Sequence, residues 1–298
     1  MQNLKQKKPQ TGLLYSIKVK LSNLVFFDQW ILMFDLQDDI SKSFWRFKKI
    51  LPPKDRFWAD PHIVYKDNLY YIFIEELLYN NKKGHIALIV MDGQGNYSKP
   101  EKILERSYHL SYPFVFEYKG DYYMIHGDAT NKAIEVYRCI EFPHKWVFHK
   151  ILMQHIDAVD ATLFYHQGKW WLFAGVVENK DVSTYDELFL FYADNPLSDR
   201  WISHPQNPVV SDVRKARPAG KIFEYDGNIY RPAQNGSKGY GYGLSFNQIV
   251  VLNETEYKER EVETVQPTWD RKIKGIHTFD YTNRLTLIDA KLRRTRYI

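Results

Sequence analysis

One short phrase recurs five times along this chain: an apolar strand, a turn rich in Asp, Asn or Gly, and a second apolar strand. Alternating apolar residues on both sides of such a turn predict a β-hairpin. The copies align at Asp60, Tyr112, Asp160, Ala219 and Gly275, so the phrase returns roughly every 50 to 60 residues. Because a hairpin alone cannot bury its apolar faces, the repeat predicts units that pack against one another.

A third apolar segment follows each of the first four hairpins and predicts an outer strand. These segments are residues 86–90, 134–137, 188–192 and 249–252. Units of about four strands at this spacing are typical of propeller blades. We therefore expect an all-β fold, a five-bladed β-propeller with a central funnel. A closed ring needs a clasp between first and last blades, and residues 30–34 are predicted to supply it by joining the blade near the C-terminus.

Composition agrees with this fold and restricts the partners. Aromatic residues make up 16% of the chain, which favours strands. The net charge of +5 is spread along most of the sequence, so we expect no nucleic-acid partner. Basic side chains concentrate only in residues 1–27, which we read as an arm before a propeller over 28–298. Such an arm fits an anionic membrane surface weakly. A single cysteine, Cys139, and no visible signal peptide predict a cytoplasmic location.

Two carboxylates stand at equivalent places in the repeat. Asp60 opens the first copy and Asp160 opens the third, each at the head of an apolar strand. Inner strands of a propeller line one central space, so these side chains are predicted to converge. Two carboxylates in a partly desolvated pocket can take different pKa values, as acid and base chemistry requires. The alternative is that each Asp only caps its strand or turns the chain.

The five repeats, with Ala59-Asp60-Pro61 and Val159-Asp160-Ala161 at their heads, resemble the propeller of glycoside hydrolase family 43. The resemblance implies that Asp60 is the general base and that Asp160 orients the acid and adjusts its pKa. In that family the acid is a Glu that opens the fourth blade. Here Arg217 stands at or beside that place, and an arginine cannot deliver a proton at neutral pH. This departure argues against ordinary inverting hydrolysis.

A closer resemblance is to the bacterial propeller family related to the N-terminal domain of plant glucosamine inositolphosphorylceramide transferase. It rests on phrases spread over most of the chain, at residues 57–61, 216–220, 230–234 and 275–279. Members of this group tend to accompany envelope polysaccharide synthesis. The resemblance therefore implies a role in envelope polysaccharide metabolism.

Several further residues are candidates for the site. Glu75 or Glu76 could replace the missing acid, and we take Glu76 as the catalytic candidate. The family 43 resemblance suggests that His277 helps to hold a structural cation on the propeller axis, although a lone histidine is more often hydrogen-bonded in a core. We assign His277 to substrate binding and expect no catalytic metal and no other cofactor.

Aromatic and basic side chains complete the predicted ligand contacts. Trp58 and Tyr112 are predicted to stack on sugar rings, while most other aromatic residues pack between blades. Arg217 is predicted to hold an anionic group, since a guanidinium clamps phosphate or carboxylate. The Gly-rich residues 235–243 lack the context of a phosphate-binding loop and predict a flexible loop at the mouth.

The sequence thus predicts a protein that acts on a sugar, sugar phosphate or glycoconjugate by glycosidase-like or glycosyl-transfer chemistry. The alternative is a non-catalytic glycan-binding module of polysaccharide assembly that has lost the general acid. A third and weaker hypothesis is a propeller that serves only in structural interactions. Exchange of Asp60 separates the first two hypotheses from the third, because both need the central pocket.

Overall fold

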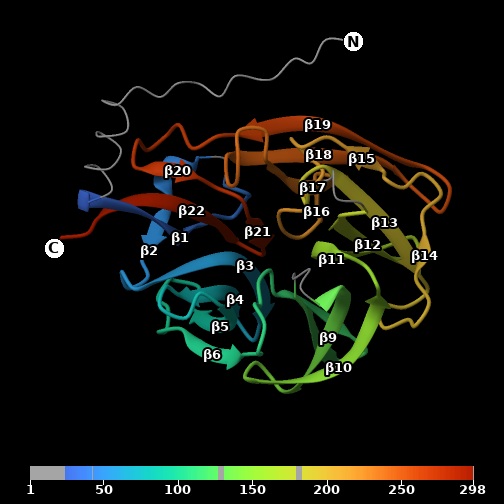
Figure 1. Ribbon diagram of the computed structural model, residues 1–298, viewed down its shortest axis with the longest axis horizontal. Coiled ribbons are helices and arrows are strands. Elements are labelled where there is room, and N and C mark those ends of the chain that lie inside the picture. Colours follow the sequence, from blue (N-terminus) through green and yellow to red (C-terminus); the bar gives the residue numbers. More distant parts are fainter. Residues whose placement is uncertain (1–23, 42, 127–130, 179–182, 298) are drawn as a thin grey trace, which may run out of the picture.

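The computed structural model describes residues 24–41, 43–126, 131–178 and 183–297. Most of the predicted basic arm, residues 1–27, lies outside the described residues. Five antiparallel sheets surround a common centre, and Figure 1 shows them as a ring that starts and ends beside β1 and β22. The prediction of an all-β, five-bladed propeller is therefore confirmed. Within the described residues, no helix has the length and apolar character needed to span a bilayer.

Each of the first four blades is built from consecutive strands, and the earliest strand in the chain is the innermost. The strands of the second blade are given below from the outside inward, and those of the other three from the centre outward. The first is β3 (Arg56–Lys66), β4 (Leu69–Leu78), β5 (Gly84–Met91) and β6 (Glu101–Leu104). The second is β10 (Lys145–Gln154), β9 (Ala133–Glu141), β8 (Asp121–Ile125) and β7 (Phe114–Tyr118). The third is β11 (Ala158–His166), β12 (Lys169–Val176), β13 (Glu187–Ala193) and β14 (Ile202–Ser203), with β15 (Val210–Ser211) also on β13. The fourth is β16 (Phe223–Tyr225), β17 (Asn228–Asn235), β18 (Gly243–Leu252) and β19 (Tyr257–Val265).

The fifth blade joins the two ends of the chain. It contains β2 (Lys48–Ile50), β1 (Phe26–Leu36), β22 (Leu285–Thr295), β21 (Phe279–Thr282) and β20 (Ile273–Gly275). A short 3₁₀ helix, Phe44–Arg46, precedes β2. Strand β1 pairs with β22 along its whole length, from Phe26 opposite Thr295 to Leu36 opposite Leu285. The predicted clasp at residues 30–34 lies within β1, and this pairing leaves neither strand as an open edge.

The heads of the repeats share an unusual backbone. Asp60, Tyr112 and Asp160 have φ angles of 50°, 47° and 54°, in the left-handed region that non-glycine residues seldom adopt. The pairing of β3 with β4 and of β11 with β12 shifts register beside the two aspartates, as it does at a β-bulge. A bulge changes the direction of a side chain within a strand. Three residues of the predicted site region thus carry this backbone strain within or beside strands.

Glycine takes the corresponding strained place in the fourth repeat. Gly220 has a φ of 132°, and a Cβ atom there would lie 1.8 Å from the carbonyl oxygen of Phe279. Backbones of the fourth and fifth blades can therefore approach each other only because residue 220 has no side chain. The amide of Phe279 donates to the carbonyl of Ala219 at 2.7 Å and joins the two inner segments.

Aromatic side chains fill the seams between neighbouring blades. Phe116 of the second blade lies 6.0 Å from Trp170 of the third, and Phe173 of the third lies 5.9 Å from Tyr257 of the fourth, between ring centroids. Phe173 is fully buried, and Tyr257 and Phe116 are nearly so. Burial of such rings is a major stabilising contribution in a fold of small sheets. The aromatic content is thus used mainly for packing between blades.

Candidate functional site

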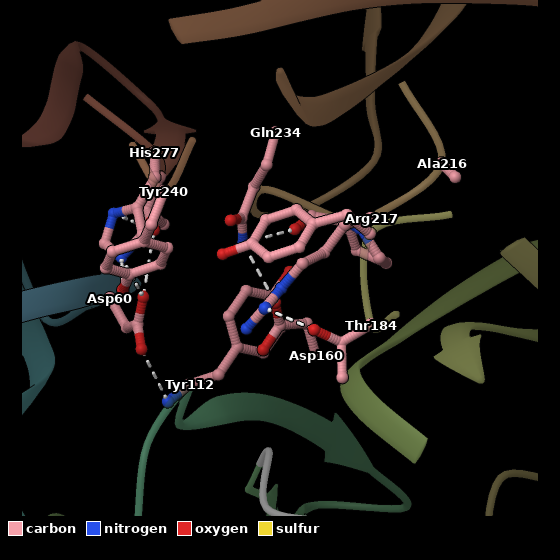
Figure 2. Close-up of polar contacts among 12 residues, drawn as sticks. Asp60, Tyr112, Asp160, Thr184, Ala216, Arg217, Gln234, Tyr240 and His277 are labelled. Carbon is pink, nitrogen blue, oxygen red and sulfur yellow. Dashed lines mark hydrogen bonds and ion pairs between the residues drawn. The ribbon is translucent and has the colours of Figure 1, made fainter. Parts of the chain in front are cut away.

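A group of polar side chains from all five blades meets where the inner strands begin (Figure 2). We call it the axial cluster, and its members are Asp60, Glu75, Tyr112, Asp160, Arg217, Gln234, Tyr240, His277, Thr278 and Asp289. Most of them are buried, although Tyr240 is 46% exposed. Asp60 and Asp160 are separated by 100 positions in the sequence but both belong to this group. The predicted convergence of the two repeat heads is thus found in the structure.

Asp60 is held by donors from two other blades. Its carboxylate accepts from the backbone amide of Tyr112 at 3.1 Å and from the hydroxyl of Thr278 at 3.1 Å. His277 Nε2 lies 3.5 Å from the same carboxylate. Burial raises the pKa of Asp60, and the nearby His277 opposes that change. These contacts fix the orientation of the carboxylate and partly compensate its charge.

His277 lies between two aspartates. Its Nδ1 is 2.6 Å from Asp289 Oδ2, and its Nε2 contacts the hydroxyl of Tyr240. The imidazole also stacks on the indole of Trp30 in the clasp strand, with centroids 4.2 Å apart. Burial acts to lower the pKa of His277, but attraction to Asp289 and Asp60 outweighs burial and raises it. His277 is therefore favoured as an imidazolium.

Asp160 has its own cationic partner. Arg217 Nε donates to Asp160 Oδ2 at 2.6 Å, and the amide of Gln234 donates to the same oxygen at 2.9 Å. A second arginine nitrogen donates to Thr184 Oγ1 at 3.1 Å, and the guanidinium lies 4.8 Å from the centroid of the Tyr185 ring. The pKa of Arg217 is raised because attraction to Asp160 outweighs burial, which alone would lower it. Arg217 thus neutralises Asp160 in the place where the resemblance expects an acid.

Two tyrosines cross the axial cluster. The hydroxyl of Tyr112 lies 2.8 Å from Thr162 Oγ1 and accepts the amide of Gly220 at 2.8 Å, so this side chain links three blades. Although part of the Tyr240 ring is exposed, its hydroxyl contacts His277, and burial of this end raises the pKa of Tyr240 well above its ordinary value. The ring packs edge-on against His277 at 4.8 Å. Tyr240 belongs to the predicted Gly-rich mouth loop. It is the exposed member that lies over His277.

The two adjacent glutamates of β4 point to different surroundings. Glu75 contacts the carboxylate of Asp60 and lies 3.3 Å from His109 Nε2. Glu76 instead accepts the indole N–H of Trp58 at 2.7 Å and lies 3.1 Å from His85 Nε2. Burial acts to raise the pKa of Glu76, but the hydrogen bonds from His85, Trp58 and Arg56 lower it. The catalytic candidate Glu76 therefore lies outside the axial cluster, while Glu75 lies inside it.

Trp58 also lies away from the axial cluster. It is 5% exposed and packs in a core between the first and fifth blades, where its indole binds Glu76. A sugar stacking on this ring would have to displace that packing. Of the seven predicted site residues, the structure brings together five: Asp60, Tyr112, Asp160, Arg217 and His277. Their roles in catalysis or binding stay predictions.

The predicted axial cation concerns Asp60, His277 and Asp289, whose ligand atoms lie within 4.8 Å of one another. The carboxylate of Asp289 already accepts the backbone amides of Asp60, His277 and Thr278, each at 3.0 Å, in addition to its ion pair with His277. A protonated imidazole has no lone pair for a metal. These residues therefore do not fit a metal centre as they are arranged, because all acceptor positions of Asp289 and both ring nitrogens of His277 are already engaged.

Two cavities lie away from the axial cluster. One of about 200 Å³ lies where the clasp blade meets the fourth blade, among Phe44, Phe223, Tyr230 and Phe279. A second is lined by Trp45, Trp269 and neighbouring residues. Neither is lined by Asp60, Asp160 or Arg217.

Sequence reasoning missed several members of the axial cluster. Asp289 carried a usable signal, because it is a lone acid within the apolar strand segment 285–290, where an unpaired charge would be costly. Gln234 ends the phrase 230–234 that supported the resemblance, but its amide bond to Asp160 has no signature in sequence. Tyr240 was recognised only as part of the mouth loop.

Comparisons with known proteins agree with this architecture. A fungal exo-β-1,3-galactanase from Phanerochaete chrysosporium, solved with β-1,3-galactotriose, matches with a TM-score of 0.59 and 10% identity, over 90% of this chain and 64% of that chain. A family 117 glycoside hydrolase from Zobellia galactanivorans matches with a TM-score of 0.56 and 12% identity, over 89% of this chain and 90% of that one. At these identities the matches show the propeller fold alone.

Sequence comparison gives a nearer relationship. Glucosamine inositolphosphorylceramide transferase 1 of Oryza sativa subsp. japonica is 32% identical over 206 residues, which is 68% of this chain and 27% of that protein. The Arabidopsis thaliana protein of the same name is 32% identical over 209 residues, 69% of this chain and 27% of that protein. The chain thus spans about a quarter of the length of these relatives. The family profile described as glucosamine inositolphosphorylceramide transferase 1, N-terminal, matches residues 51–298, and the chain belongs to this family.

Proposed function

We propose that this protein acts on a sugar or glycoconjugate at the axial cluster, by glycosidase-like or glycosyl-transfer chemistry. The observation that carries the proposal is the convergence of Asp60 and Asp160, from the heads of the first and third repeats, into one buried group (Figure 2). The named activities of the relatives and of the fold neighbours, which act on sugars, support the same class of ligand.

In this proposal Asp60 is the general base. Its carboxylate is oriented by Tyr112 and Thr278 and retains acceptor capacity for the hydroxyl of an attacking water or sugar. Removal of that proton strengthens the nucleophile as it forms a bond to the anomeric carbon, while the bond from that carbon to the leaving-group oxygen breaks and this oxygen takes its proton from solvent. His277, paired with Asp289, supports the charge of Asp60. Tyr240, the exposed residue above His277, supplies an aromatic surface for the ring of a sugar.

Arg217 shapes the proposal in two ways. Its guanidinium is paired with Asp160, so a neutral sugar is a better ligand for the axial cluster than a sugar phosphate, which would compete with that carboxylate. Arg217 also stands where the family 43 resemblance expects the acid. That observation favours a second candidate function, a glycan-binding module without turnover.

The test uses Asp60→Asn in the full chain, with Asp67→Asn as the matched control. Asp67 is an exposed turn residue of the same hairpin, also with positive φ. Sugar release or transfer is measured on a panel of oligosaccharides and sugar nucleotides, and affinity by calorimetry. Loss of turnover with retained affinity in Asp60→Asn supports the enzyme. If the wild type binds glycans but shows no turnover, loss of affinity in Asp60→Asn supports the binding module. If turnover and affinity are the same in Asp60→Asn as in the wild type, both functions are overturned.

The finer assignments are proposals of the same kind. We place the protein in envelope polysaccharide metabolism because of the resemblance noted in its sequence. We also propose a cytoplasmic location, which is consistent with a buried free Cys139 whose thiol pKa burial raises to about 11. Such a thiol is poorly reactive and carries no requirement for an oxidising compartment. Fractionation of cells that express the untagged protein tests the location.

A further inference from the structure

Two carboxyl groups of the first blade meet in the axial cluster. Asp60 and Glu75 are 7% and 5% exposed, and their side chains are within hydrogen-bonding reach of each other. Two ionised carboxylates in contact would repel strongly in a site without water, so the pair holds a proton between them. The position of that proton decides what each residue can do.

The surrounding donors place the negative charge on Asp60. Asp60 accepts hydrogen bonds from Tyr112 and Thr278 and lies beside the His277 imidazolium. Among the described residues, Glu75 is paired with His109, at 3.3 Å. Burial raises the pKa of Glu75 well above its ordinary value, and the neighbouring charge of Asp60 adds to the increase. The carboxyl with fewer donors is therefore the one that keeps the proton.

A chain of hydrogen bonds fixes which oxygen of Glu75 carries it. The backbone amide of Gly84 donates to His109 Nδ1 at 2.9 Å, so a neutral His109 has its proton on Nε2. That nitrogen faces Glu75 Oε1, which acts as the acceptor. The hydrogen of Glu75 is then on Oε2. The series of donors thus runs from Gly84 through His109 to Glu75.

Gly84 also supplies the space for this series. A Cβ atom at residue 84 would lie 2.8 Å from His109 Cε1 and 2.9 Å from Glu75 Oε1. The absence of a side chain therefore lets the imidazole and the carboxyl approach each other. Asp160 has a comparable neutral donor on its own side of the axial cluster, since the amide of Gln234 donates to it at 2.9 Å.

We infer that Glu75 is a neutral carboxylic acid that donates a hydrogen bond to Asp60 and thereby positions the proposed base, with His109 holding the acid in its donating orientation. The catalytic consequence rests on the proposed function, whereas the protonation state does not. Glu75 is too close to Asp60 to serve as the opposing acid, because carboxyl pairs that flank a glycosidic bond are separated by roughly 5 to 9.5 Å.

The inference predicts a pH dependence set by several groups. Five charged or titratable side chains act on Glu75: Asp60, His109, Asp160, Tyr240 and Asp289. They come from the first, third, fourth and fifth blades and from the segment between β6 and β7. Three of these are acids that oppose ionisation of Glu75. Alkaline conditions that finally ionise it would place two negative charges side by side and release Asp60 from its orientation.

Infrared spectroscopy of the full chain tests the protonation state directly. The expected result is a carboxylic acid C=O component at neutral pH that appears in the wild type minus Glu75→Gln difference spectrum; any band from the buried Asp280, whose pKa is also raised by burial, is common to both proteins and cancels. Glu76→Gln is the matched control, since Glu76 is the adjacent buried acid and its pKa is lowered. Absence of that component from this difference spectrum, or its presence in the wild type minus Glu76→Gln difference spectrum, overturns the inference.

The positioning role has a separate readout. Because an amide can donate as a neutral acid does, Glu75→Gln should keep glycan affinity within about threefold of wild type and abolish the alkaline loss of affinity. Glu75→Leu, of similar size without a donor, should lose affinity at least tenfold. Equal affinity in the two variants, or an unchanged alkaline limb in Glu75→Gln, overturns the positioning role. If Asp60→Asn leaves affinity unchanged, the proposed function fails while the infrared result still decides the state of Glu75.

Discussion

Exchange of Asp289 for Asn tests whether the His277 ion pair organises the axial cluster. Asp289 has 0% exposure, and its Oδ1 accepts the amides of His277 and Thr278. Its Oδ2 accepts the amide of Asp60 and pairs with His277 Nδ1. Asn at this position can retain the first two hydrogen bonds, but an NH₂ group replaces Oδ2. The substitution therefore removes two contacts and one charge with almost no change of volume.

The expected loss of stability follows from these two contacts. A buried amide left without an acceptor costs about 1–3 kcal/mol. Breaking a buried ion pair from one side costs about 3–5 kcal/mol. The two costs share one atom and are not additive, and His277 can limit the second by releasing its proton. We expect Asp289→Asn to lower the free energy of unfolding by about 4 kcal/mol near pH 6.

The sign of the pH dependence is also fixed. In the wild type the pKa of His277 is raised, so its contribution to stability is complete below the unfolded value of about 6.5 and is lost as pH rises through the folded pKa. In Asp289→Asn, burial is opposed by the attraction to Asp60 alone, and we expect His277 to be neutral in the folded state. The variant then loses about 1.4 kcal/mol for each pH unit below about 6.5. The difference from wild type should therefore be larger at pH 5 than at pH 8.

Urea unfolding followed by tryptophan fluorescence measures this difference at pH 5, 6.5 and 8. Asp270→Asn is the control, because Asp270 pairs with Lys49 at the surface and its loss should cost about 0–1 kcal/mol. A difference below about 1 kcal/mol for Asp289→Asn, or one that does not change with pH, would refute an imidazolium at His277.

Three further expectations concern other parts of the fold. Arg217→Met leaves Asp160 buried without its cation, so the unfolding free energy should fall by about 3–5 kcal/mol in a denaturant titration, while Arg217→Lys should lose less. Gly220→Ala should prevent accumulation of folded protein, because its Cβ would overlap a carbonyl of β21, whereas Gly227→Ala, with positive φ but open space, should cost about 1 kcal/mol by calorimetry. Truncation of residues 1–36 removes β1, so β22 becomes an open edge and light scattering should report aggregation.

The fold could be predicted because its main determinants are local. Each hairpin is encoded by a turn, such as Asp67-Asn68 or Gln167-Gly168, whose residues adopt positive φ in the structure. Alternating apolar residues on either side give the strands. The clasp was predictable for a topological reason, since a ring needs closure and residues 30–34 formed an apolar run outside the repeats. The pairing of β1 with β22, which are far apart in the sequence, then follows from closure of the ring.

The site was predicted only in part because strand faces depend on register. Glu75 and Glu76 are adjacent, so one faces the axial cluster and the other the interior of the blade. Pairing shifts in β3 beside Asp60, so which residues of β3 lie opposite Glu75 and Glu76 has no marker in a single sequence. Glu75, not the candidate Glu76, is therefore the glutamate that faces the axial cluster, and neither residue has been tested as the acid. Asp60 and Asp160 were found because the repeat itself identifies equivalent positions.

The charge balance of the axial cluster connects these observations to the choice of ligand. Asp60, Asp160 and Asp289 carry three negative charges, and Arg217 and His277 carry two positive charges, each already in contact with an aspartate. With Glu75 neutral, the group has one excess negative charge. An anionic ligand would meet that excess and would have to displace Asp160 to reach Arg217. A neutral sugar meets neither obstacle, and positive charge that develops at its anomeric carbon would be stabilised by the excess on Asp60.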